Sequence, residues 1–137
     1  MTAQPYNGYM PRSRAHKAST VPYEWQEQAE LVEILQWKGL TPVHIPNGGQ
    51  RTQAGHAIAK KCGEQKGFPD LMILEPVPNQ PTKRVYIEMK RTKGGTVSEA
   101  QAEWMYRIIK NGDIHILAKG ANDAIKQLQT ADTGWRL

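Results

Sequence analysis

Apolar residues from Tyr23 onward follow two spacings that predict different secondary structures. Residues 23–38 carry one broad helical stripe and are followed by Gly39, a natural helix stop; the stripe consists of Ala29, Leu31, Val32, Ile34 and Leu35. The patterns and turn signals together predict helices over residues 23–38, 53–65, 98–110 and 121–129, and strands over residues 40–45, 69–74, 84–90 and 113–118. This order indicates an α/β fold with a mixed central sheet flanked by helices.

Residues 1–22 differ from the rest of the chain. They are polar, contain Pro, Gly and Ser, and show no apolar periodicity, so we expect a flexible arm ahead of one domain over residues 23–137. The arm holds Arg12, Arg14 and Lys17 without an acidic residue. It is either a solvated tail or a basic arm that lies on nucleic acid.

Composition excludes several classes of protein. The chain has 137 residues and a formal charge of +5, which is compatible with a polyanionic partner. Cys62 is the single cysteine, so an internal disulfide framework and a multi-cysteine zinc site are excluded, and the four histidines lack ligand spacing. We expect no membrane span, no secretory signal and, without a P-loop, no nucleotide cofactor. These features predict a soluble, intracellular protein.

The two strands over 69–74 and 84–90 carry the candidate chemistry. If they form a hairpin whose ends lie near Leu74 and Arg84, opposed residues share the index sum of 158, and Asp70 faces Glu88. Side chains alternate along a strand, so Glu88 and Lys90 share one side. Two opposed carboxylates repel each other, and a hard divalent cation such as Mg²⁺ relieves that repulsion.

Such a site suits attack of water on a phosphodiester. The metal lowers the pKa of its water, and Lys90 is placed to stabilise developing negative charge. The alternative is a solvated sheet face, since an acid at a strand start and an E-x-K strand are each common. The combination of G-x-P-D, apolar strand, loop, apolar strand and E-x-K favours the catalytic interpretation.

At these residues the sequence resembles the virus-type replication-repair nuclease (VRR-NUC) family of the PD-(D/E)XK superfamily. The resemblance runs from about Tyr23 to Leu128 and includes IPNGGQR, GFPDLMIL, IEMKRTKGG and the S-x-x-Q start of the next helix. It implies a restriction-endonuclease-like core. It also implies Asp70, Glu88 and Lys90 as the catalytic core, with Asp70 and Glu88 binding Mg²⁺, or Mn²⁺ as its substitute.

The family further implies an acid from the first helix, and the sequence leaves two candidates. Glu24-x-x-x-Gln28 matches the family's E-x-x-x-Q, whereas Glu27 fits the inward stripe better and is included among the metal ligands. Either is alternatively an exposed helix glutamate. Gln101 resembles the family's helix glutamine near the active site and is expected to support it or to contact DNA.

Candidate DNA contacts cluster in sequence around the proposed site: Asn47, Arg51, Lys60, Lys61, Arg91 and Lys93. Any one of the basic residues alone is more often a solvated charge. The tryptophans are expected in the core or an interface rather than as platforms for stacked bases, and Trp25, Trp37 and Trp104 are candidates for a dimer contact.

The resemblance implies a metal-dependent DNA endonuclease in the cytoplasm of a bacterium or a phage-infected cell. Stand-alone family members imply branched DNA such as four-way (Holliday) junctions, whose two-fold symmetry suits a homodimer. Flap or single-strand trimming and restriction of foreign DNA are alternatives on the same fold. A catalytically silent DNA-binding accessory protein is an alternative of another class.

Overall fold

The computed structural model describes residues 21–137, and the predicted helices and strands occur there in the predicted order. The predicted arm over residues 1–22 lies outside the described residues except for Val21 and Pro22. The helices are α2 (Glu24–Trp37), α3 (Gln53–Lys61), α4 (Glu99–Lys110) and α5 (Ala121–Thr130), and the strands are β1 (Pro42–His44), β2 (Leu71–Ile73), β3 (Val85–Lys90) and β4 (Ile114–Lys119). No helix within residues 21–137 is long and apolar enough to cross a membrane.

The four strands form one mixed sheet in the order β1-β2-β3-β4. The β1–β2 and β2–β3 pairs are antiparallel, and β3 runs parallel to β4. Leu71 pairs with Ile87 and Ile73 pairs with Val85, which confirms the predicted index sum. The next pair in this register is Asp70 with Glu88.

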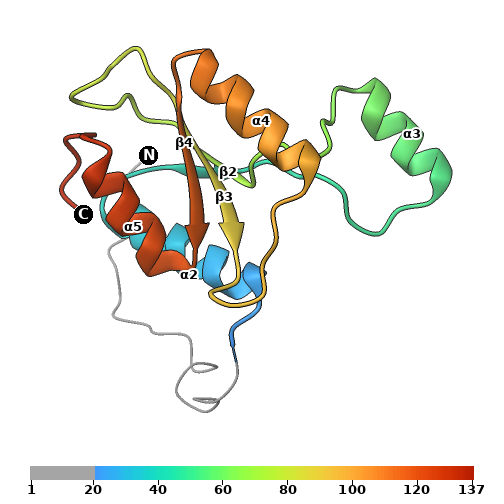
Figure 1. Ribbon diagram of the computed structural model, residues 1–137, viewed down its shortest axis with the longest axis horizontal. Helices are drawn as coiled ribbons and strands as arrows, with labels where there is room; N and C mark the ends of the chain where they lie inside the picture. Colours follow the sequence, from blue (N-terminus) through green and yellow to red (C-terminus); the bar gives the residue numbers. More distant parts are fainter. Residues whose placement is uncertain (1–20) are drawn as a thin grey trace.

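One face of the sheet carries the hydrophobic core. Leu31 and Leu35 of α2 and Leu128 of α5 pack with Ile87 and Met89 of β3 in this cluster. Helix α4 covers part of the opposite face and lies well apart from α2 and α5 in Figure 1. The residues of β3 that alternate with the core positions therefore face α4.

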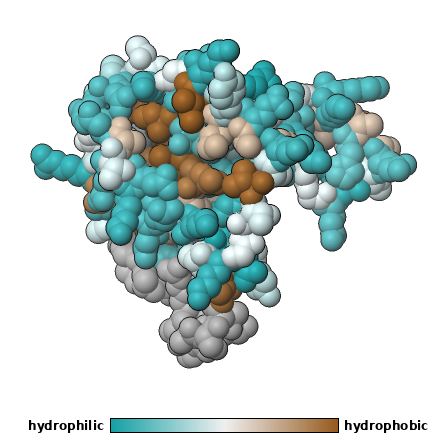
Figure 2. All heavy atoms as spheres, viewed as in Figure 1, coloured by the Kyte–Doolittle hydropathy of each residue, from teal (hydrophilic) through white to brown (hydrophobic). Residues whose placement is uncertain are grey.

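Helix α3 departs from the prediction. It ends at Lys61 instead of residue 65, because Gly63 adopts a φ of 101° that right-handed helix cannot continue through. None of its residues is buried, and it projects away from the sheet (Figure 1). Figure 2 shows mainly hydrophilic side chains over this projection.

Candidate active site

The hairpin holds Asp70 against β3. Asp70 Oδ2 accepts a hydrogen bond of 2.7 Å from the backbone N–H of Met89, between the two polar residues of the E-x-K triplet. On the other side, the carbonyl oxygen of Asp70 accepts a hydrogen bond of 2.8 Å from Ile45 N, which extends the β1–β2 pairing. A backbone bond to the β1 side and a side-chain bond to β3 therefore fix Asp70.

Gln101 joins Glu88 and Lys90 through its side chain. Its Nε2 donates to Glu88 Oε1 at 2.6 Å, and its Oε1 accepts from Lys90 Nζ at 2.9 Å. Lys90 Nζ lies 3.7 Å from Glu88 Oε1. Gln101 is also the N3 residue of the capping box that begins α4, with Ser98 as the N-cap. The same side chain therefore takes part in helix initiation and in the geometry of the site.

Gly67 permits the loop before Asp70 to approach α4. Its φ is +83°, and a Cβ atom there would come within 2.6 Å of the Ala100 carbonyl carbon and 2.7 Å of Gln101 N. The G-x-P-D motif contains this glycine, but its packing role depends on the position of α4, which the motif does not indicate. Only glycine fits this contact between the Asp70 loop and the Gln101 turn.

The carboxyl groups of Asp70, Glu88 and Glu24, if all were ionised, would carry more negative charge than Lys90 neutralises. Glu88 is only 3% exposed, and burial, together with Asp70 and Glu24, raises the pKa of its carboxyl to about 8, although Lys90 opposes the shift. Burial also raises the pKa values of Asp70 and Glu24. The site therefore gains electrostatically from an additional positive charge.

These residues fit a hard divalent cation by the chemistry of their donors. Asp70 and Glu88 supply carboxylate oxygens whose ionisation burial opposes and a cation would favour. Within residues 21–137, no group of three or more Asp, Glu, His or Cys residues is already arranged to hold a metal. The paired carboxylates are thus the part of the site that is preformed.

The two glutamates of α2 occupy different surroundings. Glu24 interacts electrostatically with Lys90, Asp70 and Glu88, so its charge lies at the site. Glu27 is 1% exposed, and its Oε2 accepts a 2.8 Å hydrogen bond from Ala121 N, the first residue of α5. The inward position expected for Glu27 is confirmed, but this carboxylate contacts the start of α5.

His44 is a neighbour of the site that the sequence did not reveal. Its Nδ1 lies 3.0 Å from Gln28 Nε2 and 3.1 Å from the Asp70 carbonyl oxygen, and its tautomer decides which of them it bonds. The E-x-x-x-Q motif pointed to Gln28, whereas no spacing pointed to His44.

The predicted DNA contacts fall into two groups. Lys60 and Lys61 lie exposed on α3, and Lys93 lies exposed in the loop after β3. Asn47 and Arg51 instead hold the α3 segment in place. Asn47 Nδ2 donates to Phe68 O at 3.1 Å, and Arg51 pairs with Glu64, which also accepts from Gly48 N at 2.6 Å.

Arg91 contacts residues 21–23, the first residues that the structure describes. It donates to the carbonyl oxygens of Pro22 (3.2 Å) and Val21 (3.0 Å) and lies over the ring of Tyr23. Because Arg91 follows Lys90 directly, residues 21–23 are held beside the site.

Comparison with known proteins agrees with this architecture. A family model described as "VRR-NUC domain" matches residues 21–122. A solved structure described as "VRR_NUC domain protein" has the same fold, with a TM-score of 0.63 and 22% identity over 80% of this chain and 88% of the other. No curated protein matches. The chain therefore belongs to the VRR-NUC family, whose nuclease fold is of the PD-(D/E)XK type.

Proposed function

We propose that this protein is a divalent-metal-dependent DNA endonuclease whose catalytic residues are Asp70, Glu88 and Lys90. The observation that carries the proposal is a partly buried Asp70 held against β3, next to a buried Glu88 and Lys90 that Gln101 bridges. The VRR-NUC domain implies a nuclease, DNA as substrate and a divalent metal. The shifted pKa values of both carboxyls support the same location.

In this proposal Asp70 and Glu88 are the residues that would hold Mg²⁺ or Mn²⁺. The bound ion would lower the pKa of water and stabilise negative charge on the phosphate. The Lys90 ammonium orients the attacking water and stabilises charge at the scissile phosphate. Gln101 positions both Glu88 and Lys90 through its two hydrogen bonds. The superfamily implies products with a 5′-phosphate and a 3′-hydroxyl.

Glu24, rather than Glu27, is the further acid in this proposal. Its charge interacts with all three core residues, whereas Glu27 holds α2 to α5. Glu24 therefore acts on metal affinity and Glu27 on folding.

Matched substitutions separate these roles. We expect Glu24→Gln to weaken Mg²⁺-dependent cleavage with little change in melting temperature. Glu27→Ala leaves the buried Ala121 N–H unpaired and is expected to cost about 1–3 kcal/mol of stability. Cleavage rates at several Mg²⁺ concentrations and thermal melts measure the two effects, and the reverse pattern would refute the assignment.

Exposed lysines of α3 are proposed to bind the DNA backbone. Lys60 and Lys61 lie in the last turn of a projecting helix that contains no acidic residue. Asn47 and Arg51 position this helix, and Lys93, exposed in the loop after β3, is proposed as a separate phosphate contact.

Replacing both helix lysines tests this surface. On duplex DNA the logarithm of the affinity falls with the logarithm of the salt concentration, and each lost phosphate contact makes this slope shallower by about 0.9. Lys60→Gln with Lys61→Gln is therefore expected to make it shallower by about 2. Binding titrations at several salt concentrations measure the slope. Lys126→Gln on α5 is the control, and an unchanged slope in the double variant would contradict the proposal.

Branched DNA, cut by a homodimer with two sites, is the substrate we propose. A panel of labelled four-way junction, flap, linear duplex and single-stranded DNA tests this preference in Mg²⁺, Mn²⁺ or EDTA. Preferential junction cutting, with a dimer in sedimentation, is the expected result. Cutting of flaps or single strands alone would replace the substrate, and binding without cutting would favour the accessory-protein alternative.

A further inference from the structure

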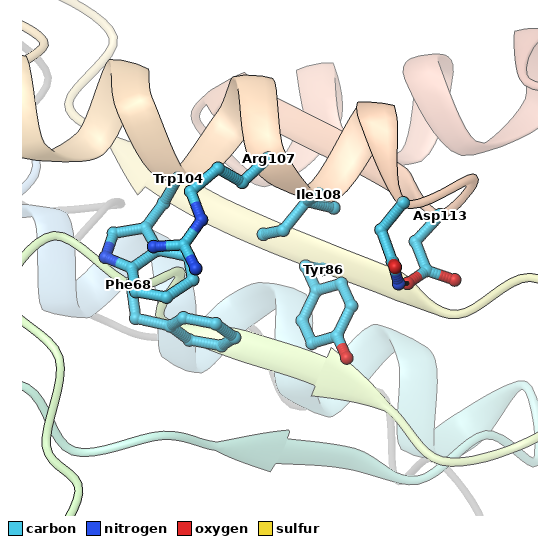
Figure 3. A pocket seen from close by; sticks show the side chains of 7 residues that line it. Phe68, Tyr86, Trp104, Arg107, Ile108 and Asp113 are labelled. Atoms are coloured by element: carbon cyan, nitrogen blue, oxygen red, sulfur yellow. Dashed lines mark hydrogen bonds between the residues drawn. The ribbon is translucent and has the colours of Figure 1, made fainter.

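A second concave site lies beside the catalytic residues, under α4. The cavity has a volume of about 260 Å³ and is walled by Phe68, Tyr86 and Trp104, with Ile108 behind them. Arg107 and Asp113 line its polar part, and Figure 3 shows these side chains gathered between α4 and the β2–β3 hairpin. None of these residues takes part in the chemistry proposed above.

The elements that position the active site also build this cavity. Phe68 precedes Asp70 by two residues, and Trp104 follows Gln101 by nearly one helical turn. Tyr86 precedes Glu88 by two residues on the same side of β3, about 7 Å along the strand. A DNA strand that runs from the active site along β3 towards Tyr86 would pass next to the cavity.

The aromatic walls are held in place before any ligand arrives. Phe68 meets Trp104 edge-on with ring centroids 5.0 Å apart, and it meets Tyr86 with centroids 5.5 Å apart. The indole N–H of Trp104 donates to Lys66 O at 3.1 Å, and Asp113 accepts from Arg84 N at 2.8 Å. Fixed rings bind a flat partner at a low cost in conformational entropy.

Size and charge indicate what the cavity takes. Its volume lies just below the ~300 Å³ at which sites for drug-sized ligands begin, so one small ring system fits better than a base pair. The Arg107 guanidinium lies over the Trp104 ring, 4.3 Å from the ring centre, so on that side of the indole it is the guanidinium that a ligand meets. It supplies positive charge for a phosphate attached to the ring system. Aromatic rings and guanidinium planes both stack on unstacked nucleobases.

We propose that this cavity binds one unpaired nucleobase of the DNA strand, adjacent to the phosphate in the active site. The inference rests on the proposed nuclease function and names its substrate more closely. A base inside a duplex must first leave the stack, which costs a few kcal/mol, so the cavity favours DNA that already has an unpaired base there. Flaps and single strands meet this requirement and uninterrupted duplex does not, whereas a fully paired four-way junction meets it only where a base pair opens at the branch point.

The test compares single-stranded thymidine oligomers with oligomers of the same backbone that lack bases. Both carry the same phosphate charge, and Ca²⁺ in place of Mg²⁺ keeps binding separate from cleavage. Wild type is expected to bind the base-bearing strand more tightly by roughly 5- to 150-fold. Trp104→Leu is expected to abolish this preference. Tyr106→Leu, which removes an aromatic ring from the exposed side of α4, is expected to retain it.

Asn111→Phe provides an independent variant should Trp104→Leu fail to fold. Asn111 lies at the exposed edge of the cavity, so a larger side chain fills the space without removing an aromatic wall. Equal affinity of wild type for both oligomers, or an undiminished preference in a folded cavity variant, would overturn the inference. A base preference that depends on the cavity, in a protein that cuts no DNA in Mg²⁺ or Mn²⁺, would instead refute only the nuclease function.

Discussion

Asp70→Asn and Lys90→Met are each expected to slow Mg²⁺-dependent cleavage by roughly 10³-fold or more, because a catalytic metal and its neighbouring charge contribute several kcal/mol. The substituted asparagine retains an oxygen to accept the Met89 N–H bond, and the substituted methionine retains most of the lysine stem, so the fold is expected to persist. Single-turnover cleavage with saturating enzyme measures the rates, and circular dichroism checks folding.

A remote substitution of the same kind provides the control. Lys126→Met removes a lysine from the exposed surface of α5 and is expected to cleave at the wild-type rate. Calorimetric titration with Mn²⁺ is expected to show lost binding in Asp70→Asn. A folded Lys90→Met protein that cleaves within a few-fold of wild type would remove Lys90 from the mechanism.

The buried Glu88 is expected to make the metal-free protein less stable as pH rises. Its pKa is about 8 in the folded protein, against an ordinary value of 4.5, so between these values the folded state holds a proton that the unfolded state has released. The free energy of unfolding therefore falls as pH rises from about 4.5 towards 8. Asp70 and Glu24 shift in the same direction, and Lys90 opposes all three.

Glu88→Gln removes this contribution while keeping an oxygen for Gln101. Urea unfolding in EDTA is expected to show the variant gaining stability over wild type with rising pH, reaching a few kcal/mol near pH 8, since one pKa unit corresponds to about 1.4 kcal/mol. Glu103→Gln, an exposed change on α4, is the control. Parallel pH profiles for wild type and Glu88→Gln would contradict the electrostatic account of the site.

The hairpin could be predicted from sequence because its constraints are local. Alternation along each strand, with one face buried, fixes the register even though the connection over residues 74–84 is long, and the register places Asp70 opposite Glu88. Gln101 could be predicted for a similar reason, since it belongs to the S-x-x-Q motif that begins α4, and its side chain bonds to residues of β3.

Features that depend on distant elements could not be predicted. Helical periodicity turns Glu27 inward, but only the location of α5 shows that Ala121 is its partner. The predicted end of α3 at residue 65 is wrong, because Gly63 has a φ of 101° and ends the helix. The aromatic cavity combines Phe68, Tyr86 and Trp104 from three separate segments, and no spacing in the sequence connects them.

Cleavage of end-labelled branched DNA by the wild-type protein, with Mg²⁺ or with EDTA, tests the central proposal most directly. The account predicts cutting with Mg²⁺ that leaves 5′-phosphate ends, disappears in EDTA and is lost in Lys90→Met. Cutting that continues in EDTA, or that Lys90→Met retains, would show that the site formed by Asp70, Glu88 and Lys90 does not perform the reaction.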